Sequence, residues 1–278
     1  MGEERGVVFI FIAANMKIID KTILTKLKKP LPNSHKGQNG RILIIAGSKK
    51  YHGALLLTVQ AASRIVDMVY VHSSDNNMKL INKLRSEIAA FIAIGKKELW
   101  DTIALVDSII IGPGMPETGD TIGLVHDILH KHPEKKIVVD ATALWHVKPS
   151  CLHKNSIVTP HSREFINVFG VEATARNVRD MAEKYGCVVV LKGAVDYISD
   201  GHELYANKTG NVGMTKGGTG DVLAGIIGAL SATNDILVSA LAGAYLNGLL
   251  GDRLYKKAGV FYNAEDLIGE SGKLWKEM

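Results

Sequence analysis

The sequence has few cysteines, no long run of one charge and no long apolar stretch, and each shortage excludes a class of protein. Only Cys151 and Cys187 occur among 278 residues, which is too few for a disulfide framework and fits a reducing cytosol. The formal net charge of +5 is spread along the chain, without the lysine and arginine cluster of a nucleic-acid-binding arm. We therefore expect a cytoplasmic protein that does not bind nucleic acid.

The apolar segment at residues 7–14 is too short to span a membrane or to act as a secretion signal, and it follows two glutamates. We expect no membrane association. Met16 is a second candidate start, so we assign residues 1–23 to an N-terminal extension and residues 24–278 to one domain. No repeat, low-complexity segment or linker rich in proline or serine divides that domain.

Short β-branched runs alternate with amphipathic stretches, which is the pattern of strands joined by crossover helices in a mainly parallel sheet. The expected strands are residues 41–46, 69–72, 108–111, 136–139, 156–159 and 187–191. The expected helices are residues 54–67, 121–131, 173–185, 222–232, 236–254 and 263–276. Residues 196–199 and 202–206 flank Asp200-Gly201, a two-residue hairpin signal, which predicts an antiparallel end of the sheet. The fold class is therefore α/β.

Ligands of such sheets bind beyond the carboxyl ends of the strands, so the residues at those positions are the candidates for a site. Five strand ends carry glycine, proline or polar residues: Gly47-Ser48 leading to Gly53-Ala54, Gly112-Pro113-Gly114, Asp140, Thr159-Pro160-His161 with Glu164, and Lys192-Gly193. Turn chemistry explains any one of these loops. Five of them on one edge indicate a ligand site.

Residues 211–232, NVGMTKGGTGDVLAGIIGALSA, place a glycine cluster and one carboxylate at the start of a long apolar helix. Gly217, Gly218 and Gly220 allow the backbone to approach a ligand, and the free amides of the helix N-terminus attract anions. Beside a phosphate, Asp221 is suited to accept the proton of a hydroxyl that is being phosphorylated. The alternative is that Asp221 only caps the helix and favours its positive end.

Taken in order, the motifs resemble those of the ADP-dependent NAD(P)HX dehydratases, nicotinamide nucleotide repair enzymes with the ribokinase-like fold. The match covers roughly residue 24 to the C-terminus, and its motifs read GRILIIAGSKKYHGA, IGPGM, VVDATALW, VTPHSREF, VLKGAVDYI and GNVGMTKGGTGD. The resemblance implies a three-layer α/β/α sandwich with a mainly parallel central sheet and an antiparallel edge. It also implies that ADP, or ATP in some members, drives dehydration of the S epimer of hydrated NADH or NADPH, called NADHX and NADPHX.

The resemblance also assigns site residues. Those that contact the hydrated nicotinamide nucleotide are Ala54, Gly114, His161 and Asp221. Those that hold the adenine nucleotide are Lys192, Gly193, Ala194, Val195, Asp196 and Gly220. From the chemistry of the glycine loop, we expect the amides of Gly217, Gly218, Thr219 and Gly220 to steady the transferred phosphoryl group. Mg²⁺ is implied because phosphoryl transfer needs a divalent ion, but no ligand cluster is visible and the metal ligands stay unknown. A lone histidine after proline also suits a structural role, and a lysine at a strand end is as often solvated.

The chain departs from the family pattern in three places. Val212 stands where proline is common, Met115 stands where leucine is common, and Ser162-Arg163 replaces a frequent Pro-Gly pair. The last change affects the loop expected to hold the substrate. The epimerase domain that many members carry ahead of the dehydratase is not part of the sequence, so we expect a separate epimerase.

Two other functions stay open. A small-molecule kinase of the same fold, acting on a thiamin-precursor or sugar alcohol, would share the GGTGD loop, although TPHSREF, GPGM and KYHGA favour the dehydratase. A non-catalytic nucleotide sensor would not need Asp221. The apolar segment at residues 237–250 carries more hydrophobic residues than one helix face needs, which predicts a homo-oligomer, a tetramer by the resemblance.

Overall fold

One mixed β-sheet runs through the chain. The computed structural model describes residues 16–84 and 89–276 and orders the strands β1-β10-β9-β8-β7-β6-β5-β2-β3-β4. All run in one direction except β9, which pairs antiparallel with β8 and β10. The strands are β1 Met16–Ile18, β2 Arg41–Ile45, β3 Met68–His72, β4 Ile92–Ala93, β5 Ser108–Ile111, β6 Lys136–Val139, β7 Ser156–Val158, β8 Val188–Leu191, β9 Asp196–Ser199 and β10 Leu204–Asn207.

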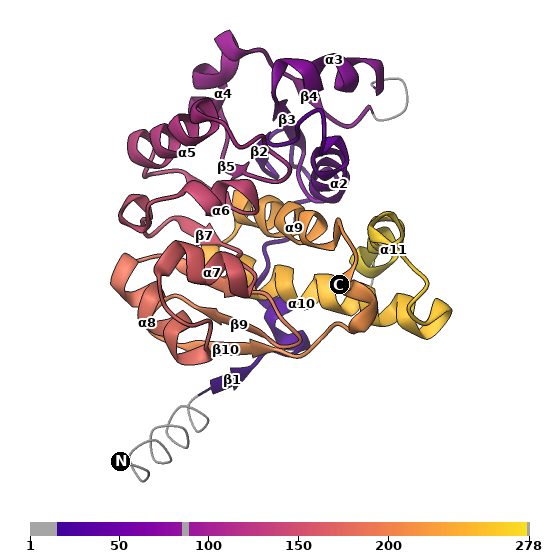
Figure 1. Ribbon diagram of the computed structural model, residues 1–278. Helices are drawn as coiled ribbons and strands as arrows, with labels where there is room; N and C mark the ends of the chain where they lie inside the picture. Colours follow the sequence, from indigo (N-terminus) through magenta and orange to yellow (C-terminus); the bar gives the residue numbers. More distant parts are fainter. Residues whose placement is uncertain (1–15, 85–88, 277–278) are drawn as a thin grey trace.

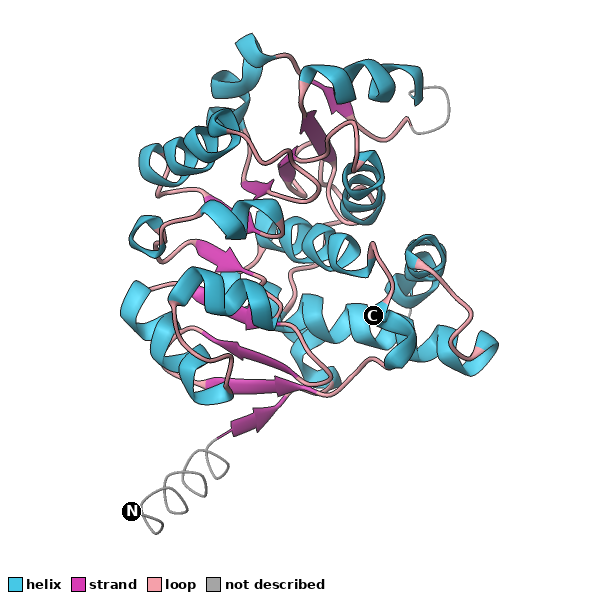
Figure 2. Cartoon of the chain, in the orientation of Figure 1, coloured by secondary structure: helices cyan, strands magenta, loops and turns pink. Residues whose placement is uncertain are grey.

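Helices cover both faces of the sheet, which gives three layers (Figures 1 and 2). One face packs against α2 His52–Ala62, α3 Asp75–Leu84, α9 Thr219–Thr233, α10 Ile236–Ala258 and α11 Ala264–Lys276. The other packs against α4 Leu99–Leu105, α5 Gly119–Lys131, α6 Thr142–His146, α7 Ser162–Phe169 and α8 Ala175–Tyr185. Short 3-10 helices are η1 Lys21–Lys26, η2 Lys96–Glu98, η3 Pro149–Cys151 and η4 Val212–Thr215.

The predicted α/β/α architecture and its antiparallel edge are confirmed. Each of the six strands expected in the parallel part is present, with its ends within one residue of the expected ones. The sequence did not predict β1, β4, α3, α4, α6 or α7. Most of these elements are short, and α6 has only 5 residues, which is too few to show a periodic pattern.

Strand β1 and helix η1 lie inside the segment that we assign from the sequence to an N-terminal extension. β1 pairs in parallel with β10, with Met16 opposite Leu204, and the side chains of Ile19 and Ile23 are buried in the core. Residues 16–23 therefore pack as part of the sheet domain. Residues 1–15, with the apolar segment 7–14, lie outside the described part of the chain.

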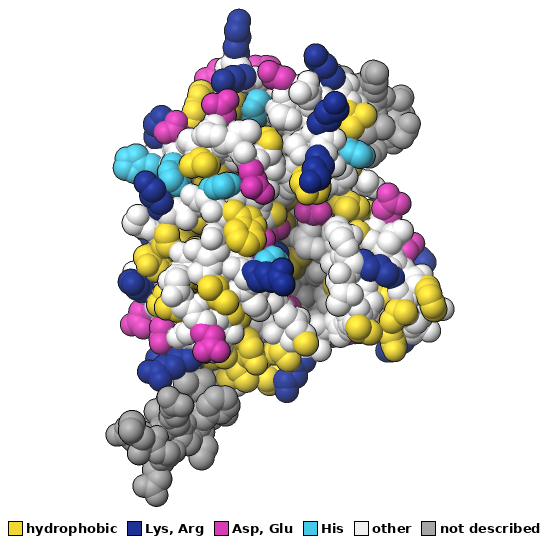
Figure 3. All heavy atoms as spheres, viewed as in Figure 1, with side chains coloured by type: hydrophobic (Ala, Val, Ile, Leu, Met, Phe, Trp, Pro, Cys, Tyr) yellow, Lys and Arg dark blue, Asp and Glu magenta, His cyan; other side chains and the backbone are white. Residues whose placement is uncertain are grey.

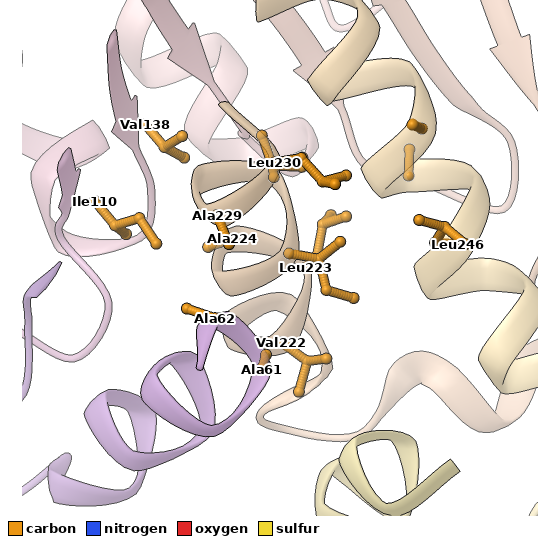
Figure 4. Packing of buried hydrophobic residues seen from close by; sticks show 14 of the residues in the cluster. Ala61, Ala62, Ile110, Val138, Val222, Leu223, Ala224, Ala229, Leu230 and Leu246 are labelled. Atoms are coloured by element: carbon orange, nitrogen blue, oxygen red, sulfur yellow. The ribbon is translucent and has the colours of Figure 1, made fainter. Parts of the chain in front are cut away.

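Helix α9 is the central element of one layer and fixes the direction in which the glycine loop faces (Figure 4). It lies on Ile110 and Val138 of the sheet, with Ala61 and Ala62 of α2 on one side and Leu246 of α10 on the other. Small residues allow this close packing: a side chain on Gly228 would come within 2.3 Å of Ile110. A helix held on three sides gives its N-terminal turn a fixed position at the edge of the sheet.

Helix α10 is apolar on most of its circumference, and most of its surface is buried within the single chain. It contacts α9, α11, η1 and the strands β7 to β10. This intramolecular burial accounts for the hydrophobic excess from which we predicted an oligomer, so the tetramer stays a prediction that rests on the family resemblance. Within residues 16–84 and 89–276, neither α10 nor another helix has the length and apolarity needed to cross a bilayer.

Candidate active site

The loops after β2 and β5 meet at the carboxyl edge of the sheet and bring Ala54 and Gly114 together. The amide of Gly47 donates to the carbonyl of Pro113 at 2.7 Å, which joins the two loops. Gly114 has a φ of +62°, and a side chain there would lie 2.6 Å from the carbonyl oxygen of Tyr51 and 2.8 Å from Cβ of Ala54. Only glycine allows this approach. Two residues that the resemblance assigns to the substrate are therefore in contact range.

A single hydroxyl connects this pair to Asp221. Oγ1 of Thr58 lies 2.8 Å from the carbonyl oxygen of Ala54 and 3.2 Å from that of Asp221, so its proton is shared between two helices. Helices α2 and α9 therefore present their first turns side by side. Both N-terminal ends direct unpaired amides toward the same space, which favours a ligand with negative charge.

The first turn of α9 begins at a backbone conformation that favours glycine. Gly218 is the N-cap with a φ of +96°, and it makes no side-chain cap hydrogen bond. Thr219 does not reach toward a ligand with its hydroxyl, which lies 2.8 Å from the carbonyl of Met214 and 3.0 Å from that of Lys216. Thr219 therefore braces the loop, and the cap position held by Gly218 leaves the amides of the turn open. Asp221 lies in the first turn but is not the cap.

A network of buried charged groups lies under this turn. Asp140, whose side chain is 2 % exposed, follows β6, and its Oδ1 accepts from Nζ of Lys192 and from Oγ1 of Thr159, both at 2.8 Å. A side chain on Gly220 would lie 3.7 Å from Nζ of Lys192, so the ammonium group lies against the glycine loop. Asp140 and Glu164 raise the pKa of Lys192, although burial alone would lower it. Lys192 is thus an ion-paired cation and not a solvated strand end.

The side chain of Asp221 faces this network and does not cap α9. Burial is the main cause that raises the pKa of Asp221 to about 7, Asp140 raises it further by repulsion, and Lys192 opposes the shift. A carboxyl group with a pKa near neutrality is matched to the task of accepting a proton. The structure therefore favours a general base over a helix cap for Asp221.

His161 has a structural role and also an open face. Its Nδ1 accepts from the amides of Arg163 at 3.1 Å and Glu164 at 3.2 Å, while Oε2 of Glu164 accepts from the amide of His161 at 2.9 Å. This reciprocal cap starts α7 and fixes the imidazole plane. The ring is 49 % exposed and lies edge-on to Trp145 at 6.4 Å. Backbone pairing with Lys192 places His161 next to the charged network.

The segment from Lys192 to Asp196 forms the turn between β8 and β9. The carboxylate of Asp196 holds it, with Oδ1 accepting from the amide of Gly193 and Oδ2 from the side chain of Asn207, each at 3.0 Å. Gly193 and Ala194 are exposed at the tip. The turn therefore offers a rigid backbone surface next to Lys192, on the antiparallel side of the sheet.

The expected site residues thus lie along one edge of the sheet, next to a hollow near the centre of the face in Figure 3, where Figure 1 places the first turn of α9. The structure adds Thr58, Asp140 and Glu164 to them. The sequence marked Asp140 and Glu164 only as residues after strands. For Asp140, a carboxylate directly after a buried strand was the signal that could have given it a role.

Mg²⁺ fits this site as an ion carried by a nucleotide. Within the described residues, no three His, Cys, Asp or Glu side chains are grouped to hold a metal. In phosphoryl-transfer sites Mg²⁺ keeps several waters and takes one or two carboxylates together with substrate phosphates. Asp140 and Glu164, which both act on Lys192, supply such carboxylates next to the glycine loop.

Comparison with known proteins identifies one family among those that share this fold. The family described as NAD(P)H-hydrate dehydratase matches residues 42–273. The chain belongs to this family. The match includes the glycine loop and every strand end discussed above, and the family is one of hydro-lyases.

Individual relatives agree with the family. A protein of Nitrosopumilus maritimus, described as an ADP-dependent (S)-NAD(P)H-hydrate dehydratase, is 35% identical over 92% of this chain and 97% of its own length. A bifunctional NAD(P)H-hydrate repair enzyme of Methanocaldococcus jannaschii is 39% identical over 88% of this chain. The chain spans only 50% of that enzyme's length. The ADP/ATP-dependent dehydratase of Bacillus subtilis, co-crystallised with ATP and Mg²⁺, superposes with a TM-score of 0.75 at 28% identity, covering 92% of this chain and 95% of its own.

Proposed function

We propose that this family member dehydrates the S epimer of NADHX or NADPHX to NADH or NADPH, with ADP as phosphoryl donor and AMP and phosphate as products. ATP is the alternative donor. The observation that carries the proposal is the state of Asp221. Its pKa is raised, and it lies in the first turn of α9, next to the open amides, without capping the helix. The same edge of the sheet holds each residue that the resemblance assigns to substrate and nucleotide.

The reaction has two steps in this geometry. The ring hydroxyl oxygen attacks the terminal phosphorus of the donor, the bond to the departing nucleotide breaks, and Asp221 accepts the hydroxyl proton. The ring carbon then loses phosphate, which takes the hydroxyl oxygen with it, and the neighbouring ring carbon loses a proton to restore the double bond. Phosphorylation is needed because hydroxide is a poor leaving group.

Two parts of the chain stabilise the transferred group. The amides of Gly217 to Gly220 surround its oxygens, and Lys192 supplies a positive charge that Asp140 holds in place. When bound with the nucleotide, Mg²⁺ offsets the charge on the phosphate oxygens. By the resemblance, the turn at residues 192–196 holds the adenine nucleotide.

The pH dependence follows from the pKa of Asp221. Because only the ionised carboxylate accepts a proton, kcat/KM is expected to fall tenfold per pH unit below a midpoint near the pKa of about 7. Measuring kcat/KM for the hydrate between acidic and alkaline pH checks this. A profile that stays flat through neutral pH contradicts the role of Asp221 as the base.

The direct test of the function is regeneration of the reduced coenzyme. Freshly prepared NADHX is incubated with the protein, Mg²⁺ and ADP or ATP, and the absorbance of the reduced nicotinamide ring is followed together with released phosphate. We expect recovery only when nucleotide is present. No recovery with either donor, combined with phosphorylation of hydroxyethylthiazole or a sugar alcohol, would assign the chain to the kinases of the same fold.

We also propose that the enzyme is a cytoplasmic homotetramer that works after a separate epimerase. The cytoplasmic location rests on the cysteine content and on the nature of the coenzyme pool. Light scattering at micromolar concentration is expected to give four times the chain mass of 30.1 kDa. A mass near that of one chain contradicts the tetramer.

A further inference from the structure

A second pocket opens at the same edge of the sheet, on the side covered by α4 and α5. Its volume is about 620 Å³, which lies within the usual range of small-molecule sites. Ala46 and Gly47 at the end of β2 and Met115 in the loop after β5 form one wall. Met115 directly follows Gly114, which lies against Tyr51 and Ala54. The pocket therefore begins one residue beyond the expected substrate contacts.

The substrate needs such an extension. It is a dinucleotide, and only its hydrated ring reacts beside Asp221, so the pyrophosphate and the adenosine half must lie elsewhere. The N-terminal turn of α2 at His52 to Ala54 has no side-chain cap and leaves its amides open for the pyrophosphate. The adenosine half then has to continue past Tyr51 and Gly114, toward the pocket.

A cavity at the opposite edge of the sheet does not meet this need. It measures about 810 Å³ and is lined by residues such as Lys28, Arg64 and Asn234. Arg64 and Asn234 follow the C-terminal ends of α2 and α9, while the reacting groups lie at the N-terminal ends of the same helices. The length of these helices separates that cavity from Asp221, so it is not an extension of the substrate site.

The lining of the 620 Å³ pocket suits a nucleoside. Trp100 is 40% exposed; it stacks on His132 with ring centroids 5.9 Å apart, and Nζ of Lys131 lies 5.4 Å from its ring centroid, so only its remaining exposed surface is available to a base. Leu99 and Leu124 add apolar contacts. Ser73 fixes the pocket wall, because its hydroxyl donates to the carbonyls of Ala46 and Gly47 at 2.5 and 3.0 Å.

The charges of the pocket distinguish a ribose from a phosphorylated ribose. Three carboxylates line it, those of Asp75, Asp120 and Asp127, against the ammonium group of Lys96. Asp75 follows the end of β3, the strand next to β2. In dinucleotide-binding folds a carboxylate after the strand adjacent to the phosphate loop accepts from the ribose 2′-hydroxyl, and it repels a 2′-phosphate.

We propose that this pocket binds the adenosine half of the hydrated dinucleotide and that its carboxylates, Asp75 first among them, select NADHX over NADPHX. The proposal rests on the proposed function. It assigns the residues at the ends of β2 and β3 to substrate recognition, beyond the four contacts that the resemblance gives. It also separates this site from the adenine nucleotide of the donor, which lies at the turn after β8.

A variant that fills the pocket with a larger side chain tests the location of the adenosine site. Gly123 lines the pocket in α5, and nothing lies within 4 Å of a Cβ atom built there, so Gly123→Leu can begin its side chain in open space and extend it into the pocket. We expect the KM for NADHX and the dissociation constant for NADH to rise about tenfold or more, with kcat and the KM for ADP within about twofold. Gly269→Leu is the matched control, since it adds the same side chain to an equally open helix position in α11.

The possible results distinguish a failure of the adenosine site from a failure of the proposed function. Unchanged NADH binding and unchanged KM in Gly123→Leu overturn the adenosine site. If the wild-type protein does not regenerate NADH at all, the proposed function fails, while the dissociation constant of NADH still decides whether the pocket holds the adenosine half. Equal losses in Gly123→Leu and Gly269→Leu also overturn the site, because they report a general effect on the fold.

A second variant tests the selection. The wild-type protein is expected to favour NADHX over NADPHX by about tenfold in kcat/KM, and Asp75→Asn to reduce this ratio at least about threefold, mainly through the KM for NADPHX. The dissociation constants of NADH and NADPH should follow the same order. A wild-type preference for NADPHX, or an unchanged ratio in Asp75→Asn, contradicts the role of the carboxylates.

Discussion

The Asp221→Asn variant is expected to lose about 10²- to 10⁴-fold in kcat while its dissociation constant for ADP changes little. The substitution keeps the size of the side chain but removes the proton acceptor. Nucleotide binding is retained because the open amides of α9 and the ammonium group of Lys192 do not depend on Asp221. Single-turnover measurements with NADHX and equilibrium binding of ADP give the two values from one preparation.

The free energy of unfolding of the same variant also distinguishes the two roles considered for Asp221, general base and helix cap. The folded-state pKa of about 7 lies above the ordinary value of 3.8, so ionising this group in the folded protein costs stability as the pH rises from 3.8 to 7. Asp221→Asn is therefore expected to be more stable than the parent at pH 8, by about 2 kcal/mol after allowing for partial exposure, and equal to it near pH 4. A cap role predicts no gain. Turnover within a few-fold of the parent would place the base elsewhere in the site.

Lys192→Met is expected to destabilise the fold most strongly among substitutions in the site. It leaves the buried carboxylate of Asp140 without its ammonium partner, and breaking a buried pair in this way costs about 3–5 kcal/mol. Loss of the cation raises the pKa of the facing carboxyl groups, so protonation relieves the strain and the loss is smaller at pH 5 than at pH 8. Urea unfolding at both pH values measures the difference.

The control for this variant is Lys154→Met, which removes an exposed lysine from the loop before β7 at the other edge of the sheet. Its stability should match the parent at both pH values. If Lys192→Met is as stable as Lys154→Met at pH 8, the pair with Asp140 does not support the site.

The strands were predictable because β-branched runs are a local signal. Residues 108–111 and 136–139 match β5 and β6 residue for residue, and the hairpin signal at Asp200-Gly201 marked the antiparallel edge. Helices α6 and α7 were missed because five and eight residues show little periodicity. Strand β1 was missed because Met16–Ile18 acquires its structure only by pairing with β10, far along the chain.

Site residues were easier to predict from the sequence where a backbone conformation requires glycine, as at Gly218. They were harder to predict where their proximity depends on the order of the strands in the sheet. Asp140 and Lys192 are 52 residues apart and meet because β6, β7 and β8 are neighbours. The order of strands is not a local property of the sequence. The sequence also left Asp221 between a cap and a base, because only the backbone conformation shows that Gly218, and not Asp221, is the N-cap of α9.

The path of one oxygen atom tests the central claim most directly. NADHX prepared by hydration in water enriched in ¹⁸O carries the label in its ring hydroxyl. If ADP phosphorylates that hydroxyl before elimination, the label leaves in inorganic phosphate, one atom for each NADH that is regenerated. Label found in water instead of phosphate would show that hydroxide leaves without phosphorylation and would contradict the account.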